Sequence, residues 1–462
     1  MIDFELSEDQ KALQKTVREF AQAEIAPHSR KWDNESHFPI ELVPKLGALG
    51  LLGMTIPEAY GGSAMTMQEV ALVIEELAAV DGSVAITVAS HNGLCSGHIS
   101  LFGNEDQKSR YLPDLALGKK LGAWGLTEPG SGSDAAGAKT RATRLADGSW
   151  SISGQKTFIT QGSVGGVAVI LAVTSPEKKQ RGITAFIVDY GTPGFSASRR
   201  IEKMGLHASD TSELLLEDVR VPDSQRLGEL DHGFIDTLRI LDKGRITIGA
   251  MALGLGAGAT AAAIRYAKER RQFGKSLAEF QAIQNMIADN ATELEAARLL
   301  IRRAAWMYDS GGRITLAASM AKLYAAQAAM RACDRAVQIH GGAGYMQAYA
   351  VERFYREASV CSGIDSDHIV AVLRRAQFGR RSERIGDEQI ELALEDVETQ
   401  HGVEDAAAEK ACNIIRDEGA KARRANRGHL PAYLPREETV IEPEAKACPC
   451  CGGGSGTTIG RH

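Results

Sequence analysis

The sequence has few of the features that mark secreted, membrane-bound or nucleic-acid-binding proteins. Its N-terminus, MIDFELSEDQ, lacks the basic and apolar regions of a signal peptide. Its formal net charge of −6 provides no excess of basic residues for nucleic acid or an anionic membrane surface. Its seven cysteines show no framework spacing, which favours a reducing compartment without disulfides. We therefore expect a cytoplasmic protein with no nucleic-acid and no membrane partner.

A long, strongly apolar run is also lacking. The nearest approach to one, residues 246–264, is uncharged, but about half of it is Ala and Gly. Small residues suit a closely packed helix inside a large core better than contact with lipid. This run predicts a core helix rather than a membrane span.

Aromatic residues are scarce at the C-terminal end. The last 99 residues contain only Phe378 and Tyr433, and they carry 14 Lys or Arg against 18 Asp or Glu, a net charge of −4. Apart from one or two helices, such a segment cannot bury enough apolar area to offset its ordering entropy. We expect residues 364–462 to be a poorly packed tail.

The rest of the chain begins and ends with helical patterns. Ser7, with Gln10 three residues later, forms a capping box, and Leu13 and Val17 follow at helical spacing. Helical periodicity returns after residue 233. A stripe there recurs every three or four residues and predicts a buried helix face: Leu316, Met320, Leu323, Ala326, Met330, Cys333 and Val337.

The middle of the chain has the residue pattern of a β-strand domain. Short β-rich runs (WSISG, GVAVILAV and GITAFIV) are separated by clusters of Gly, Pro, Ser and Asp. This pattern predicts a small β-barrel or β-sandwich. We therefore expect an α+β fold with a helical domain (1–120), a β-domain (121–232), a four-helix bundle (233–363) and the tail (364–462).

Four segments carry candidate cofactor chemistry. A loop rich in Gly and hydroxyl residues can bring backbone N–H groups close to a polar ring or a phosphate. Taken singly, such a loop is more often an ordinary loop, and a lone charged residue is more often part of a surface ion pair. The four segments are AWGLTEPGSGSDAAG (123–137), GQKTFIT (154–160), KERRQFGKSLAEFQAIQ (268–284) and QIHGGAGY (338–345).

In this order, on a helix–strand–helix background, the segments resemble the acyl-CoA dehydrogenase family of flavoenzymes. KMGLHASDTSELLLEDVRVP (203–222) and ILDKGRITIGAMALG (240–254) match the same family. The resemblance extends from residue 1 to about residue 362 and is strongest to short-chain or general bacterial members. It implies that family's fold, an FAD cofactor, an acyl-CoA substrate, an electron-transferring flavoprotein as partner, and a homodimer or homotetramer.

The resemblance also implies roles for single residues. Thr127 and nearby backbone N–H groups would bind the pyrimidine edge of the flavin, Phe158 would flank its ring, and Thr160 would lie near the hydride-accepting nitrogen. Arg270 and Gln281 would reach the FAD pyrophosphate across a subunit interface.

The remaining implied contacts involve the adenylate and the substrate. Ser133, Asp242 and Arg245 would hold the acyl-CoA, and two glycines near residue 341 would allow close backbone approach to the adenylate. The implied cofactor set is Trp124, Leu126, Thr127, Ser133, Phe158, Ile159, Thr160, Arg270, Gln281, Gln338, Gly341 and Gly342.

The catalytic base is where this chain departs from the family. A carboxylate must face the α-carbon while a β-hydride moves to the flavin, and in the family a Glu stands at one of two places. The first place matches Gly244 here. The second follows FYREASVC, where Asp365 stands, with Ser366 and Asp367 in place of a Gly and a Thr. Because Asp is one methylene shorter than Glu, we expect an impaired base.

The tail accounts for this departure. Residues 373–398 and 427–453 resemble the N-terminal region of transposases from a bacterial insertion-sequence family. An insertion that interrupted the dehydrogenase reading frame near residue 363 would explain both features. Cys448 and Cys451 have the spacing of half a zinc site, but with His462 they form a poor ligand set, so we expect no metal.

Hypotheses from different classes compete for the function. The leading one is an FAD-dependent acyl-CoA dehydrogenase of fatty acid metabolism, with impaired formation of trans-2-enoyl-CoA. The alternatives are a catalytically inactive flavin- or acyl-CoA-binding fusion remnant and a flavin-dependent acyl-CoA oxidase. A DNA- or zinc-binding module built on the tail is disfavoured by its acidic charge and its poor ligand set.

Overall fold

Helices make up the first part of the structure, a computed structural model that describes residues 5–363. The predicted capping box begins α1: Ser7 Oγ accepts a hydrogen bond from Gln10 N, and Gln10 Oε1 accepts one from Ser7 N. Two junctions are π-helical, η1 (Ala21–Ile25) and η4 (His91–Cys95). The α-helices are α1 (Glu8–Phe20), α2 (Ala26–Asn34), α3 (Val43–Ala48), α4 (Met67–Ala78), α5 (Gly82–Ser90), α6 (Ser96–Phe102) and α7 (Glu105–Ala116).

A mixed sheet follows. Its strands run in the order β6-β7-β3-β2-β4-β5-β8, and β1 pairs in parallel with β4. The strands are β1 (Gly122–Gly125), β2 (Arg141–Arg144), β3 (Trp150–Thr160), β4 (Val167–Val173), β5 (Ile183–Asp189), β6 (Phe195–Ala197), β7 (Thr211–Val221) and β8 (Arg226–Leu227).

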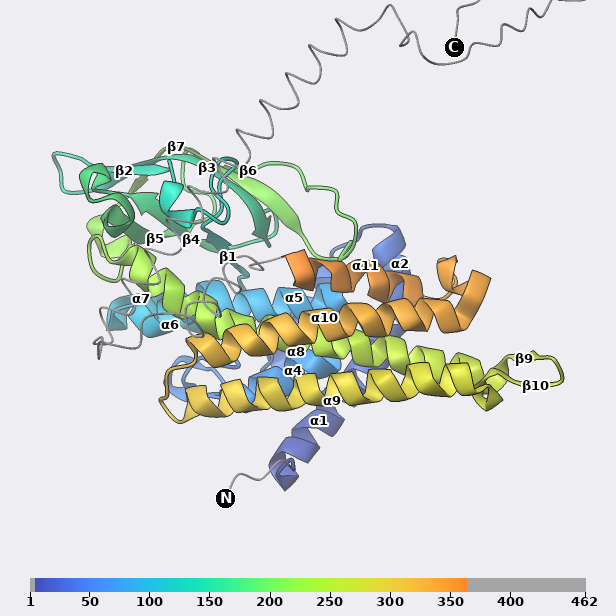
Figure 1. The fold of residues 1–462 in the computed structure, drawn as a ribbon. Helices are drawn as coiled ribbons and strands as arrows, with labels where there is room; N and C mark the ends of the chain where they lie inside the picture. Colours follow the sequence, from blue (N-terminus) through green and yellow to red (C-terminus); the bar gives the residue numbers. More distant parts are fainter. Residues whose placement is uncertain (1–4, 364–462) are drawn as a thin grey trace, which may run out of the picture. The chain divides into compact units, whose positions relative to one another are not determined.

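The sheet is divided into two halves that share one core. β2 and β4 are joined by a single residue pair, Arg141 with Val173. Buried side chains from strands on both sides of that junction belong to one cluster, in which the rings of Trp150 and Phe186 lie 5.4 Å apart. The expected β-domain is therefore present as a two-part mixed sheet (Figure 1).

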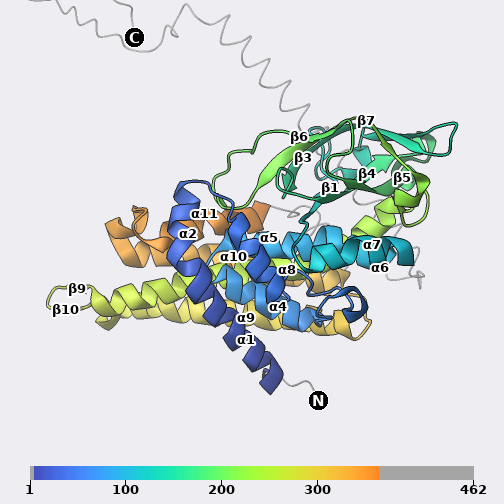
Figure 2. The same ribbon diagram turned by 180° about the vertical axis from the view of Figure 1, so that it is seen from behind.

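The third part is again helical. It contains α8 (Gly233–Glu269), α9 (Gln281–Asp309), α10 (Thr315–His340) and α11 (Ala350–Gly363), with a hairpin of β9 (Arg271–Gln272) and β10 (Lys275–Ser276) between α8 and α9. Figure 1 shows α8, α9 and α10 side by side, and α4 of the N-terminal part packs against α8 (Figure 2). The helical domains therefore share a core, and the predicted α+β fold is confirmed.

Small residues in α8 make this packing possible. A Cβ added at Gly254 would lie 2.2 Å from the carbonyl oxygen of Glu75, and one at Gly258 would lie 2.3 Å from that of Ala79, both on the α4 side. By length and composition alone, α8 could cross a membrane, but 78% of its most apolar window is buried inside the protein. This is the burial expected of a core helix.

The predicted buried stripe of α10 is wrong at its beginning. Leu316 is 43% exposed and Met320 is 38% exposed. The buried face of α10 is instead built mainly from alanines, including Ala317, Ala321 and Ala325. Small side chains let α10 approach α8 closely, so the larger ones are displaced to the flank.

Candidate functional site

A buried ion pair joins the loop after β1 to strand β3. Lys156 Nζ lies 2.7 Å from Glu128 Oε1 and donates a second hydrogen bond to the Leu126 carbonyl at 3.1 Å. Glu128 also accepts hydrogen bonds from the backbone N–H groups of Lys139 and Thr140. Burial lowers the pKa of Lys156 to about 8, against the opposing effect of Glu128. The pair holds the Gly- and Ser-rich loop against the sheet.

Strand β3 ends in a strained turn. Phe158 has φ = 57° and Gln161 has φ = 61°, and the pairing of β3 with β7 shifts register between Lys156 and Ile159. The Phe158 ring is 67% exposed, whereas Ile159 is buried. Positive φ at a bulky residue is costly and tends to occur at functional sites. The turn therefore presents an aromatic face next to the Thr160 hydroxyl.

Two buried histidines of the α5–η4–α6 run position β1. His91 Nδ1 accepts a hydrogen bond from Gly122 N, and His98 Nδ1 accepts one from Trp124 Nε1, both at 3.1 Å. Burial lowers the pKa of His98 to about 3, so this ring is neutral and carries its proton on Nε2. No described residue bonds to that Nε2. This hydrogen bond from Trp124 Nε1 to His98 fixes the orientation of the indole ring.

Asp242 and Arg245 form an ion pair near the beginning of α8. Thr315 Oγ1 donates a hydrogen bond to Asp242 at 2.6 Å. Burial raises the pKa of Asp242, while the charges of Arg245 and Arg313 oppose the shift. The buried Nε of Arg245 has no hydrogen-bond partner among the described residues. The site therefore has a donor available for a polar ligand.

The other predicted cofactor residues are exposed at the far end of the bundle. Tyr266 of α8 stacks on His340 of α10 with ring centroids 4.2 Å apart, which brings the ends of these helices together. Figures 1 and 2 both show the β9–β10 hairpin at the end of the bundle away from the sheet. A single chain therefore does not join this set to the Phe158 region. The exposed set is Arg270, Gln281, Gln338, Gly341 and Gly342.

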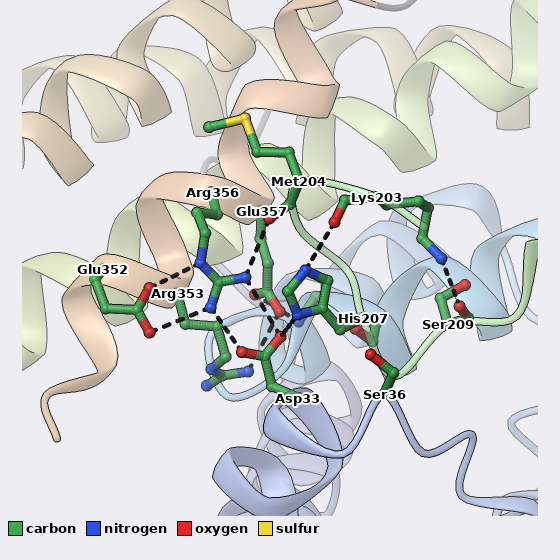
Figure 3. Close-up of polar contacts among 12 residues, drawn as sticks. Asp33, Ser36, Lys203, Met204, His207, Ser209, Glu352, Arg353, Arg356 and Glu357 are labelled. Carbon is green, nitrogen blue, oxygen red and sulfur yellow. Dashed lines mark hydrogen bonds and ion pairs between the residues drawn. The ribbon is translucent and has the colours of Figure 1, made fainter. Parts of the chain in front are cut away.

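Ion pairs anchor α11, the helix that leads to the predicted base (Figure 3). Arg353 donates hydrogen bonds to Asp81 at 3.0 Å and to the Val80 carbonyl at 2.7 Å. Arg356 bonds Asp33 of α2 at 2.6 Å and Glu352 at 2.7 Å. The network therefore ties α11 to the N-terminal helices.

Glu357 is the most deeply buried member of the network. It accepts a hydrogen bond from Gly82 N at 3.2 Å, and Arg353 lies 3.5 Å away. Burial raises its pKa to about 8, because one backbone donor and a shared arginine offset its desolvation only in part. Asp365 itself lies outside the described residues.

The ion pairs and the histidine contact were not predicted from the sequence. Glu128 and Lys156 both lie inside recognised motifs, and Lys156 stands in the middle of a β-rich run. A charge at a strand position that faces the core is the signal that could have revealed the pair. No comparable signal marked His98, because its role depends on a partner in a distant segment.

The described part of the chain contains no group of three or more metal-ligating side chains. Its three cysteines, Cys95, Cys333 and Cys361, are buried free thiols. The predicted half-site of Cys448, Cys451 and His462 lies outside the described residues.

Comparison with known families accounts for most of the chain. Residues 7–119, 123–219 and 231–364 match the N-terminal, middle and C-terminal domains of acyl-CoA dehydrogenases. The chain belongs to the acyl-CoA dehydrogenase family. Members of this family are flavoproteins that use FAD. The predicted classification as an acyl-CoA dehydrogenase enzyme is therefore confirmed.

The individual relatives align with about the same part of this dehydrogenase as the three family domains do. Probable acyl-CoA dehydrogenase YngJ of Bacillus subtilis is 43% identical over 78% of this chain and 94% of the relative. Caffeyl-CoA reductase-Etf complex subunit CarC of Acetobacterium woodii is 44% identical over 77% of this chain and 93% of the relative. The solved structure of butyryl-CoA dehydrogenase from Megasphaera elsdenii has a TM-score of 0.79 and 40% identity, covering 81% of this chain and 100% of that one.

The tail of this dehydrogenase matches a different family. Residues 367–439 match the family described as Transposase C of IS166 homeodomain. The predicted likeness to insertion-sequence transposases is therefore confirmed, and it begins within a few residues of the end of the dehydrogenase match.

Proposed function

We propose that the chain is an FAD-dependent acyl-CoA dehydrogenase that converts acyl-CoA thioesters to trans-2-enoyl-CoA, with a rate limited by its altered base. The observation that carries the proposal is the exposed, strained Phe158 turn, held beside the loop after β1 by the buried Lys156–Glu128 pair. Such a strained backbone conformation persists only where the surrounding structure determines it, and it tends to occur at functional sites.

The residues present suit FAD. Trp124, Leu126, Thr127, Phe158, Ile159 and Thr160 offer an aromatic face, hydroxyls and backbone donors for the flavin ring. At Gly341 and Gly342 an added Cβ would meet nothing within 4 Å, which leaves room for the adenylate beside Gln338. We assign Arg270 and Gln281 to the pyrophosphate held by a neighbouring subunit, since both are exposed far from Phe158. Bound FAD would supply the hydride acceptor.

The protein's own residues orient the thioester and polarise its carbonyl. We assign Ser133, Asp242 and Arg245 to the acyl-CoA, with Arg313 as an additional cation near the same carboxylate. The pairing of Asp242 with Thr315 and Arg245 fixes the direction of its free oxygen lone pairs before substrate arrives. Such preorganised polar groups cost little reorganisation during the reaction.

We assign the proton abstraction to Asp365, which follows the last residue of α11, Gly363, by two positions in the sequence. A carboxylate displaced by about 1 Å from the reactive geometry can cost on the order of 100-fold in rate. The ion pairs of Arg353 and Arg356 hold α11 itself in place (Figure 3). The shortened side chain supports a reduced rate rather than a different reaction.

Electrons would leave the site through an electron-transferring flavoprotein. One relative is named as a subunit of a reductase–Etf complex, which supports such a partner for this chain. That relative is a reductase, so the same groups could deliver a proton and a hydride in the opposite direction when a reduced partner supplies electrons.

A catalytically inactive flavin- or acyl-CoA-binding protein is the second candidate. The specific observation in its favour is Asp365, together with Ser366 and Asp367, at the position of the family's Glu, Gly and Thr. An acyl-CoA oxidase would differ by consuming oxygen at the rate at which product forms.

The experiment that tests the proposal is product analysis. Purified protein is loaded with FAD and incubated with butyryl-CoA, hexanoyl-CoA and octanoyl-CoA plus a dye acceptor. Mass spectrometry should show an acyl-CoA product two hydrogens lighter, formed without oxygen consumption. Bound FAD with no product for any thioester would establish the inactive binder, and stoichiometric oxygen uptake would establish the oxidase.

A further inference from the structure

A small cavity lies on a side of α8 that the dehydrogenase chemistry does not use. Its volume is about 130 Å³, and its walls come from the N-terminal helical part, from α8 and from the end of α9. Thr55, Met65, Met67, Leu101, Lys243 and Asp309 are the lining residues that matter here. None of the residues assigned above to FAD or acyl-CoA lines it.

Lys243 provides a largely buried cation at this cavity. The residue is 4% exposed and lines the cavity beside Asp309 and Tyr308. The centroid of the Tyr308 ring is 5.8 Å from its Nζ. Burial lowers the pKa of Lys243 to about 8, and the charge of Asp309 opposes this shift only in part. A buried cation whose desolvation is only partly compensated would be stabilised further by an anion.

A hydroxyl at the same cavity lacks a partner. The hydroxyl oxygen of Thr55 is buried and makes no hydrogen bond to any described residue. Buried polar groups in folded proteins are nearly always hydrogen-bonded, so this unpartnered hydroxyl, at a cavity that Lys243 also lines, indicates a ligand. An acceptor with two oxygens would satisfy both groups.

The other residues that line the cavity limit the charge and the size of the ligand that it can bind. The carboxylate of Asp309 is already engaged by the backbone N–H groups of Met67 at 2.7 Å and Gln68 at 3.2 Å. Its negative charge disfavours a dianion such as phosphate more than a singly charged carboxylate, because the repulsion grows with the charge of the ligand. Met65, Met67 and Leu101 supply apolar surface suited to an alkyl chain. A cavity of roughly 150 Å³ holds a molecule the size of benzene, so only a short chain fits.

We propose that this cavity binds a short aliphatic monocarboxylate, with the ammonium of Lys243 and the hydroxyl of Thr55 on the carboxylate and the alkyl chain against the two methionines. The site is separate from the thioester site and does not require FAD. Its occupation is therefore independent of whether Asp365 supports turnover.

The test is calorimetric titration of the full chain with sodium butyrate, sodium octanoate and inorganic phosphate. Butyrate should bind saturably, and octanoate and phosphate should bind at least about tenfold more weakly. Lys243→Met keeps the length of the side chain but removes the charge, and it should weaken butyrate binding by about tenfold or more. Lys268→Met, at an exposed lysine on the same helix, is the matched control and should bind butyrate like the wild type.

Thr55→Val provides an independent variant that leaves the charge in place. It should weaken butyrate binding severalfold, and it carries the test if Lys243→Met does not fold. Unchanged butyrate affinity in the folded variants would overturn the proposal. So would an absence of saturable butyrate binding in the wild type, or phosphate binding as tight as butyrate binding.

Discussion

Lys156 and Glu128 show how single buried charges can position a cofactor loop. Each lies in a different motif, and together they bridge the loop after β1 and the strand that ends at Phe158. Burying both charges costs desolvation energy, which the 2.7 Å contact and three further hydrogen bonds offset. Their contribution is therefore mainly geometric, since they hold the loop after β1 against β3.

Lys156→Met should destabilise the protein and weaken FAD binding. The change leaves Glu128 buried without its cation, which typically costs about 3–5 kcal/mol. The free energy of unfolding in urea and the FAD dissociation constant measure the two effects. Lys119→Met, at an exposed lysine that pairs with Asp114 at 3.8 Å, should change stability by less than about 1 kcal/mol. Equal effects of the two substitutions would contradict this role for the pair.

At the scale of elements, α11 is the last described helix before the predicted base, Asp365. Its arginines reach α2 and the α4–α5 junction, so its position is set by the N-terminal helices rather than by the bundle alone. Asp81 also accepts hydrogen bonds from Ser83 N and Val84 N and thereby caps α5. One carboxylate thus fixes the beginning of α5 and the direction of α11 together.

Glu357→Gln should remove part of the pH dependence of stability. The pKa of Glu357 is raised from 4.5 to about 8 by burial. The folded state therefore keeps a proton that the unfolded state loses, so this group's stabilisation is complete below pH 4.5 and is lost as the pH rises through about 8. Gln resembles the protonated form.

Urea unfolding between pH 5 and 9 measures this effect. The free energy of unfolding of the wild type should fall more over this range than that of Glu357→Gln. Glu352→Gln, on the same helix, is the matched control and should keep the slope of the wild type. A Glu357→Gln variant with the same slope as the wild type would show that Glu357 is ionised when folded.

The sequence predicted where helices and strands occur better than it predicted which face of a helix is buried. The capping box at Ser7 and the core helix at 246–264 follow from local patterns, and the structure has both. The stripe that begins at Leu316 and Met320 misled because a hydrophobic pattern identifies a helix but not which of two apolar flanks is buried. In α10 the alanines decide that question.

The candidate site residues also differ in how far the sequence alone reveals them. Phe158 and Thr160 were predicted from a motif, because motif positions carry their chemistry locally, and their roles stay predictions. The contact of His98 with Trp124 and the network around Arg356 join segments far apart in the sequence, so no local pattern reveals them. Spatial neighbours of this kind require the fold.

At the scale of the whole molecule, the two groups of predicted cofactor residues lie far apart in one chain. The residues predicted to bind the flavin ring lie on β1, on β3 and in the loop after β1, whereas those predicted to bind the phosphates lie toward the end of the bundle that carries the β9–β10 hairpin. Phe273 in that hairpin is 94% exposed and Tyr345 is 86% exposed. Large exposed apolar side chains often mark an interface. A complete FAD site on this account needs two copies of the chain.

Phe273→Glu should therefore reduce both assembly and cofactor binding. Light scattering after size exclusion should show a dimer or tetramer for the wild type and a smaller species for the variant, with FAD affinity lowered at least about tenfold because a hot-spot aromatic is lost. Ile40→Glu places the same charge at an exposed apolar residue of the N-terminal part and should change neither property. A monomeric wild type that binds FAD tightly would contradict this arrangement.

The most direct test of the central claim is the rate at which butyryl-CoA bleaches the bound flavin under anaerobic conditions, in the wild type and in Asp365→Glu. The account predicts slow bleaching in the wild type and an increase on the order of 100-fold in Asp365→Glu, because the longer side chain restores the reach of the base. Equal rates in the two proteins, or no bleaching in either despite bound FAD, would contradict it.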